Sequence, residues 1–422
     1  MFTAVILLQL CIMKTTSSPN AVTRPRTVFL HYLPWFTIQP TAQAPEHYRR
    51  GWCGVGELSS GCYDTTKKQY VGEGPLIGEY DQHDIDVLEH HLLLAQSAGV
   101  NVLLINCNPV NLLQVEITKL MFTVASNMLK KYGSDVFRLQ LAISYDNNQA
   151  TTREQVRADF TLLAKVYATD NRTVSFTDII SGGPVIILWS ENVPEIVYAV
   201  AKEFLSSQAT VVVRNPRAYA YSDGNFAWIL PKSAPFEPGV LATYWGEQAL
   251  KDFEWGMSHQ DDSSLYLHKN QLAMGAVYPG FDDTNVPIDW NNGVKRKVLR
   301  HVRAGSTYEL TWNHILGFIS NRYGGGDENI VDMPWVQIIT WNDYPEGTQI
   351  EPRSGLNGTA TYEQTLLYIS RWKGGEVNEG EQETEETLKR KAIFIVNVSV
   401  DILNARRTLL TALSVGISTE ES

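Results

Sequence analysis

Two carboxylates stand three residues apart in the stretch TWNDYPEGTQIEP, which runs from Thr340 to Pro352. If Asp343 and Glu346 lie in one turn, their Cβ atoms are about 5–6 Å apart and their side chains point to the same side. Carboxylates this close increase the proton affinity of one member of the pair. Cleavage of a glycosidic bond uses such a pair, with one group as acid and one as carboxylate. The same two residues also fit a capping box, with Asp343 as N-cap and Glu346 at N3.

Other apolar segments of the chain also end in polar or aromatic residues. His31 could bind a sugar hydroxyl or lie satisfied in the core, and Asn106 could hold a hydroxyl or cap a turn. Tyr145 begins the stretch YDNN, which is also good turn chemistry. The candidate ligand contacts of this kind are His31, Tyr32, Trp35, Asn106, Tyr145, Tyr278, Asp282, Trp341 and Asn342.

Short apolar segments alternate with helical patterns along the chain. We expect strands at Val28–Leu33, Val102–Asn106, Leu139–Ser144, Val185–Leu188, Thr210–Val213, Phe226–Ile229, Leu272–Tyr278 and Trp335–Trp341. The helices between them are expected at Asp84–Ala98, Gln114–Lys131, Arg153–Ala168, Pro194–Ser206 and Tyr308–Ile319. Eight such units predict an α/β fold, a (β/α)8 TIM barrel, in which residues after the strands meet on one face. A doubly wound open sheet is the main alternative, but no glycine-rich phosphate loop follows the first strand.

The charge and composition of the chain limit the classes of molecule that it is expected to bind. The formal net charge is -11, from 46 acidic against 35 basic residues. This balance disfavours nucleic acid, which is bound through cationic side chains. The 11 tryptophans and 19 tyrosines suit a sugar site, although such rings are also common in a large core. We therefore expect an oligosaccharide or polysaccharide partner.

The two ends of the chain differ from its central part. Residues 1–23 resemble a signal peptide, because the apolar run Phe2–Met13 is too short to span a bilayer. Sequons at Asn171, Asn357 and Asn397 also favour secretion. We expect a secreted or luminal protein without a stable membrane span. The barrel should occupy residues 24–373, followed by an acidic linker at 374–391 and a segment of unreadable role at 392–422.

The cysteines and histidines do not indicate a metal site. Cys53 and Cys62 bracket a glycine- and serine-rich loop and could form a disulfide in an oxidising compartment. Cys107 lies in an apolar run and fits a buried free thiol. His90 and His91 are adjacent, so they point to different faces of a helix. No metal and no cofactor is expected.

Four motifs together resemble the glycoside hydrolase family 71/99-like proteins, which include endo-α-mannosidases and α-1,3-glucanases. They are HYLPWF at 31–36, GPLIGEYDQHDIDVLEHHLLLAQSAGV at 74–100, VYPGFDD at 277–283 and WNDYPEGTQIEP at 341–352. The resemblance covers roughly residues 27–373 and keeps the order of the motifs. It implies a (β/α)8 barrel and a glycosidase active on α-linked sugars, and it adds Tyr80 and Asp81 to the sugar-site candidates.

The resemblance also implies roles for the acid pair. Endo-α-mannosidases carry two glutamates in a Trp-Asn-Glu-x-x-Glu-Gly pattern, which fall here on Asp343 and Glu346. In that family the first is a base on the sugar 2-hydroxyl and the second is the general acid, then base, giving net retention. Asp343 is one methylene shorter, which reduces its reach by about 1.5 Å. The second strand ends in Asn106-Cys107-Asn108, where many relatives have Asp-Trp-Tyr.

These expectations define one leading hypothesis and two alternatives. The leading hypothesis is a retaining, endo-acting glycosidase for α-linked mannose or glucose, with Glu346 as acid/base and Asp343 as assisting base. The first alternative is a carbohydrate-binding pseudoenzyme that keeps the site but cannot react, because of Asp343 and the altered strand end at Asn106. The second is a barrel enzyme of unrelated chemistry.

Overall fold

The computed structural model of the 422-residue chain describes the following residues: 24–37, 63–64, 69–70, 74–146, 150–167, 173–189, 194–214, 222–226, 228–229, 272–282, 300–301, 306–323, 333–353, 358–374 and scattered helical positions between 387 and 401.

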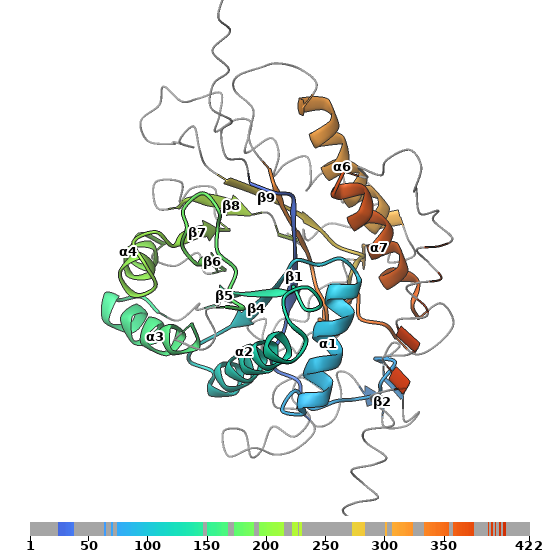
Figure 1. The fold of residues 1–422 in the computed structure, drawn as a ribbon, viewed down its shortest axis with the longest axis horizontal. Coiled ribbons are helices and arrows are strands. Elements are labelled where there is room, and N and C mark those ends of the chain that lie inside the picture. The colour runs from blue at the N-terminus through green and yellow to red at the C-terminus, as the bar shows by residue number, and fades with distance from the viewer. Residues whose placement is uncertain are drawn as a thin grey trace, which may run out of the picture.

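Eight parallel strands close into a barrel (Figure 1). In barrel order they are β1 (Thr27–Tyr32), β12 (Trp335–Ile338), β9 (Leu272–Val277), β8 (Gly224–Phe226), β7 (Thr210–Val213), β6 (Val185–Leu188), β5 (Gln140–Tyr145) and β4 (Val102–Cys107). The first strand pairs with the last, with Thr27 opposite Trp335. This closure confirms the expected barrel and excludes the open sheet. Two small antiparallel pairs accompany it: β2 (Tyr63–Asp64) with β3 (Gln69–Tyr70), and β10 (Phe281–Asp282) with β11 (Arg300–His301).

The helices lie on the outside of the barrel (Figure 1). They are α1 (Ile85–Ser97), α2 (Leu112–Tyr132), α3 (Arg153–Val166), α4 (Pro194–Phe204), α6 (Ser306–Tyr323) and α7 (Ala360–Trp372). Local sequence sets several of their ends. The side chains of Asp84 and Asn111 accept backbone N–H groups at the starts of α1 and α2, and Thr152 forms a capping box with Gln155 at α3. Gly99 follows α1 at φ 89°, the left-handed conformation expected of a residue after the helix end.

Two expected strands end earlier than hydrophobicity suggests. β8 covers Gly224–Phe226, so Trp228 follows the strand, and β12 stops at Ile338, before Trp341. Ile229 and Ile339 are nevertheless buried. Burial continues past the last ladder hydrogen bonds, which makes the strands look longer in the sequence.

The strands alternate between the barrel interior and the helix layer. One buried cluster takes alternate residues from all eight strands: Phe29, Val102, Leu104, Ala142, Val185, Ile187, Val212, Phe226, Leu272, Met274 and Trp335. The residues between them belong to the cluster packed against the helices, for example Leu30, Leu103 and Ile143. Because successive side chains of a strand point to opposite faces, this parity decides which strand-end residues can face the mouth of the barrel.

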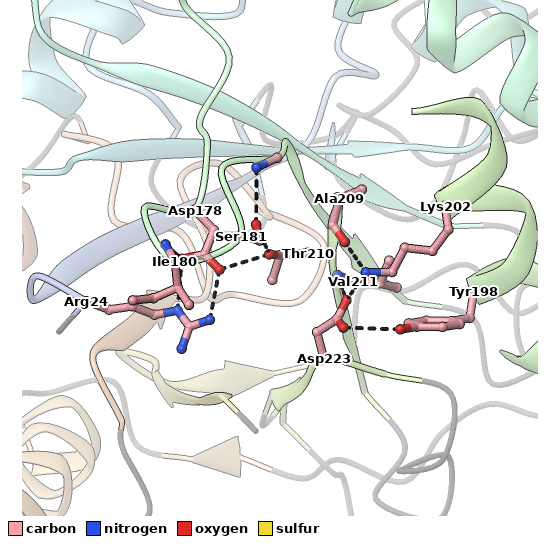
Figure 2. Close-up of polar contacts among 11 residues, drawn as sticks. Arg24, Asp178, Ile180, Ser181, Tyr198, Lys202, Ala209, Thr210, Val211 and Asp223 are labelled. Carbon is pink, nitrogen blue, oxygen red and sulfur yellow. Dashed lines mark hydrogen bonds and ion pairs between the residues drawn. The ribbon is translucent and has the colours of Figure 1, made fainter. Parts of the chain in front are cut away.

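Two groups of polar contacts, around Asp178 and around Asp223, lie near the starts of strands β6, β7 and β8 (Figure 2). The Arg24 guanidinium donates two hydrogen bonds to Asp178, at 2.9 and 2.8 Å, and Thr210 Oγ1 donates to the same carboxylate at 2.9 Å. Asp223 accepts from Lys202 at 2.8 Å and from Tyr198 at 3.1 Å. Residues at the start of the strands of a TIM barrel serve stability, because the active sites of such barrels lie at the opposite end.

Several other expectations fall at or beyond the edge of the described residues. Cys107 is a buried free thiol, as expected, and burial raises its pKa to about 12. Cys53, Cys62 and the N-terminal 23 residues lie outside the described residues, as do the sequons at Asn171 and Asn357. None of the helices in the described part of the chain is long and apolar enough to cross a membrane.

Candidate active site

The acid pair lies in a turn that follows β12. The backbone N–H of Glu346 donates to Oδ1 of Asp343 at 3.0 Å, and the N–H of Asp343 donates to Oγ1 of Thr340 at 2.9 Å. The first bond is half of the capping box, but residues 344–347 form a turn and no helix begins there. Gly347 takes φ 64°, which a side chain would disfavour, and allows the chain to reverse. The turn therefore positions two carboxylates without capping a helix.

The electrostatics of this turn raise the proton affinity of Asp343. Asp343 is only 6% exposed, whereas Glu346 is partly exposed. Burial raises the pKa of Asp343 well above its usual range, and the neighbouring Glu346 carboxylate raises it further. The N–H bond from Glu346 opposes both effects but does not reverse them. A carboxylate with a raised pKa is a stronger proton acceptor, which suits general base chemistry.

Asn342 and Trp341 are buried beside the acid turn. The Asn342 amide accepts from the N–H of Leu33 at 2.9 Å and donates to its C=O at 3.0 Å. The Trp341 ring is fully buried and packs edge-on against His91, with ring centroids 5.6 Å apart. Both side chains therefore contact other parts of the protein, and the sugar contacts expected of them stay predictions.

Strand parity divides the remaining strand-end candidates. His31 and Asn106 follow the inward residues Phe29 and Leu104 by two positions, so they face the mouth. Tyr32 and Tyr145 face outward instead, and both are fully buried. Tyr32 OH contacts Nδ1 of His91 in α1 at 2.9 Å, and Tyr145 OH donates to Asp159 in α3 at 2.7 Å. Both hydroxyls therefore bond to the helix layer, and the sugar contacts expected of these two residues stay predictions.

Two candidates, Tyr80 and Asp81, belong to the motif at residues 74–100, and the first lies in the core while the second lies in a loop. Tyr80 is fully buried and donates to Oε2 of Glu351 at 2.9 Å, so its hydroxyl is held within the protein. Asp81 accepts from Thr37 Oγ1 at 2.8 Å and from the His83 N–H at 2.9 Å. Burial alone would raise the pKa of Asp81, but these bonds and the His83 ring lower it to about 2. Asp81 is therefore an ionised carboxylate that is already hydrogen-bonded within its loop.

The remaining predicted contacts are Trp35, Tyr278 and Asp282. Trp35 is half-buried, with its ring 6.4 Å from that of Phe36. Tyr278 is almost fully buried and packs with Ile229, Phe281 and Ile339. Asp282 lies in β10, the short strand that follows β9.

A group of residues that the sequence reasoning did not select completes the mouth. Asp146, Trp189, Arg214 and Trp228 each follow an inward strand residue by two or more positions and are partly exposed. The Arg214 guanidinium stands 4.2 Å above the Trp189 ring. The rings of Trp189 and Trp228 pack edge to face, with centroids 4.1 Å apart and an interplanar angle of 77°. The Trp228 ring also packs against His31, with centroids 4.8 Å apart. Counting two residues on from each inward strand position would have found most of this group.

Burial shifts the pKa values of Asp146 and His31 at this side of the mouth. Burial raises the pKa of Asp146, against the opposing effects of Asn106 and Arg214, and Asn106 donates to its carboxylate at 3.2 Å. Burial lowers the pKa of His31 to about 3, so its imidazole is neutral. Nδ1 of His31 and Oγ of Ser144 are buried without a hydrogen-bond partner among the described residues. Such atoms suit a site where a ligand or water supplies the missing bond.

The described residues do not contain a cluster of three or more side chains suited to a metal ion. His91, considered above for its adjacency to His90, is instead hydrogen-bonded to Tyr32 and to Glu351.

Solved structures with a similar fold are glycoside hydrolases. The GH99 endo-α-mannosidase from Bacteroides thetaiotaomicron matches with a TM-score of 0.56 at 16% identity, over 84% of this chain and 99% of that chain. The same enzyme in complex with bis-tris propane matches with a TM-score of 0.54 at 15% identity, over 83% of this chain and 98% of that one. At this identity the similarity establishes the barrel fold, and it agrees with the family resemblance of the motifs.

Searches at the level of sequence add no relative. No protein-family model matches the chain, and no curated protein matches it either.

Proposed function

We propose that this protein is a glycoside hydrolase that cleaves α-linked mannose or glucose within a glycan chain. The observation that carries the proposal is the buried Asp343 beside Glu346, in the turn after the last barrel strand. Catalytic groups of barrel enzymes belong at this end of the strands. The fold similarity to an endo-α-mannosidase supports the same class of substrate.

The acid pair can carry a retaining reaction. Asp343 takes the proton of the sugar 2-hydroxyl while that oxygen bonds to C1, and Glu346 protonates the departing glycosidic oxygen. Glu346 then takes a proton from water, which attacks C1 and opens the 1,2-anhydro ring, while Asp343 returns its proton to the C2 oxygen. The raised pKa of Asp343 supports its use as the base. Its shorter side chain leaves a second course open, in which Asp343 orients the sugar or activates water.

The aromatic side of the mouth supports a sugar-binding surface. Trp189 and Trp228 present partly exposed indole rings, and flat rings of this kind pack against sugar faces. The amide of Asn106 and the Asp146 carboxylate lie at the same side and can bond hydroxyls. We therefore move the proposed subsites from the outward tyrosines to His31, Asn106, Asp146, Trp189, Arg214 and Trp228, with Trp35 at the rim.

A carbohydrate-binding pseudoenzyme is the second candidate. Two observations favour it: the shorter acid at Asp343 and the amide at Asn106, where many relatives of the resembled family carry an acid. In this case the site would bind a glycan without cleaving it.

The test is a panel of α-mannans, α-glucans and N-glycans incubated with the wild type, Glu346→Gln, Asp343→Asn and the exposed control Glu154→Gln. Sugar release by the wild type and Glu154→Gln, but not by the two site variants, would establish a glycosidase. Binding without release by all four would favour the pseudoenzyme. If neither release nor binding occurs, the carbohydrate proposal fails.

Because the sequons and N-terminal segment favour secretion, we also propose that the protein acts outside the cytosol.

A further inference from the structure

A buried hydrogen-bond network lies directly behind the acid turn. Its centre is Glu351, which is only 3% exposed. Oε2 of Glu351 accepts from Tyr80 OH and from Tyr344 OH, each at 2.9 Å. Oε1 lies 3.1 Å from Nε2 of His91. A buried carboxylate is strongly destabilising unless it is paired and hydrogen-bonded, and here three donors surround it.

The donors have a defined order that extends to β1. Gln82 Nε2 donates to Tyr32 OH at 2.7 Å, and Tyr32 OH lies 2.9 Å from Nδ1 of His91. Because Nε2 of His91 faces a carboxylate oxygen of Glu351, we assign a hydrogen to Nε2, which donates to Glu351. Burial raises the pKa values of Tyr32 and Tyr80, which keeps both hydroxyls as donors. The network thus links β1, helix α1 and the segment after β12.

The network holds the acid turn at a residue between the two carboxylates. Tyr344 separates Asp343 from Glu346 in the sequence, and its hydroxyl reaches Glu351 seven residues later. The backbone closes the same segment, with Ile350 N–H bonded to Thr340 C=O and Glu351 N–H bonded to Trp341 C=O, each at 2.9 Å. Asn342 fixes the start of the turn to Leu33. A shift of Tyr344 would therefore move both carboxylates.

We propose that Glu351, acting through Tyr344 and His91, is a positioning residue that fixes the distance between Asp343 and Glu346. Glu351 touches no substrate in this role. This inference rests on the proposed function for its kinetic reading, but the placement of the turn can be measured without it.

The experiment compares full-length Glu351→Gln and Tyr344→Phe with the wild type and with Tyr198→Phe. Tyr344→Phe removes one hydroxyl and keeps the ring, so it should fold even if Glu351→Gln does not. Tyr198→Phe is the matched control, because its hydroxyl also donates to a carboxylate, Asp223, at the opposite end of the barrel (Figure 2). Both network variants should lower kcat by about tenfold or more and change KM less than about twofold, as expected for loss of alignment. Tyr198→Phe should alter the melting temperature alone.

Hydrogen exchange of the peptide covering residues 340–351 provides the second measurement. It should be faster in both network variants and unchanged in Tyr198→Phe. An active wild type whose kcat is unaffected by Tyr344→Phe and Glu351→Gln would overturn the inference. If the wild type cleaves no glycan, the proposed function fails separately, and exchange alone decides: unchanged protection of residues 340–351 in Tyr344→Phe would overturn the positioning role.

Discussion

The backbone N–H of Glu346 donates to Oδ1 of Asp343 at 3.0 Å. This bond joins the two acidic residues of the turn and does not involve the Glu346 carboxylate. Asp343 is the buried member and Glu346 is the partly exposed one. Burial raises the pKa of Asp343, and the Glu346 carboxylate raises it further. Carboxyl groups in unequal environments are what acid–base chemistry at one pH requires.

Asp343→Asn should stabilise the fold at neutral pH. A carboxyl group whose pKa is raised in the folded state destabilises the protein increasingly as pH rises above the pKa of the unfolded chain. An amide keeps Oδ1 as acceptor but has no charge to bury. We expect the free energy of unfolding to rise by about 1 kcal/mol or more at pH 7, and by little near pH 4. Urea denaturation at both pH values measures this, and an equal gain at both would contradict it. Activity should be lost in the same variant.

Trp189→Ala should weaken glycan binding without unfolding the barrel. The Trp189 ring packs against both Arg214 and Trp228, and it is partly exposed at the mouth. We expect the dissociation constant of a bound glycan to rise about tenfold, in the range of one lost aromatic contact. Titration calorimetry with the glycan identified by the panel measures this. Trp372→Phe, a change to a buried tryptophan of α7 far along the chain, is the control, and equal losses in both would argue against the subsite.

Asp178→Asn should destabilise the protein chiefly above acidic pH. Burial alone would raise the pKa of Asp178, but Arg24, the Ile180 N–H and Thr210 lower it. A lowered pKa means that the carboxylate contributes stability above the unfolded pKa and loses it as pH falls through the folded pKa. We expect a loss of about 2–4 kcal/mol at pH 7 because Arg24 is left without its partner. Denaturation curves at pH 7 and pH 3 test this, and a loss that does not shrink at pH 3 would refute the assigned charge pair.

Gly99→Ala should destabilise more than Gly133→Ala. Both glycines have positive φ, at 89° and 77°, so a side chain is strained at either position. A Cβ at Gly99 would also stand 3.0 Å from the Ile369 side chain of α7, whereas a Cβ at Gly133 meets no atom within 4 Å. We expect about 1 kcal/mol for Gly133→Ala and roughly 1–2 kcal/mol more for Gly99→Ala. Equal melting temperatures of the two variants would show that Ile369 of α7 can move away from the new Cβ without loss of stability.

The barrel could be predicted because strand and helix periods are local properties. Each apolar segment predicted a strand near its observed place, and Gly99 marked the end of α1. The ends of β8 and β12 could not be placed, because Ile229 and Ile339 stay buried after the ladder stops. Hydrophobicity reports burial, and the final hydrogen bond of a strand depends on its neighbour.

The candidate site was only partly predictable, since it depends on parity and on distant contacts. Tyr145 and Asp146 are neighbours in the sequence, but side chains one residue apart on a strand point to opposite faces, so Tyr145 bonds to α3. Glu351 and His91 are 260 positions apart, and no pattern in the sequence joins them. The acid turn was found because both of its carboxylates lie within four residues.

The Asn342 side chain imitates a neighbouring backbone. It offers Leu33 one acceptor and one donor, as the next peptide of a paired strand would, across 309 positions of sequence. The Asn342 side chain thereby continues the hydrogen bonding between the first and last strands past Ile338. Contacts this distant in the sequence carry a large cost in loop-closure entropy. Placement of the carboxylates next to Asn342 is thus tied to the pairing of the first and last strands of the barrel.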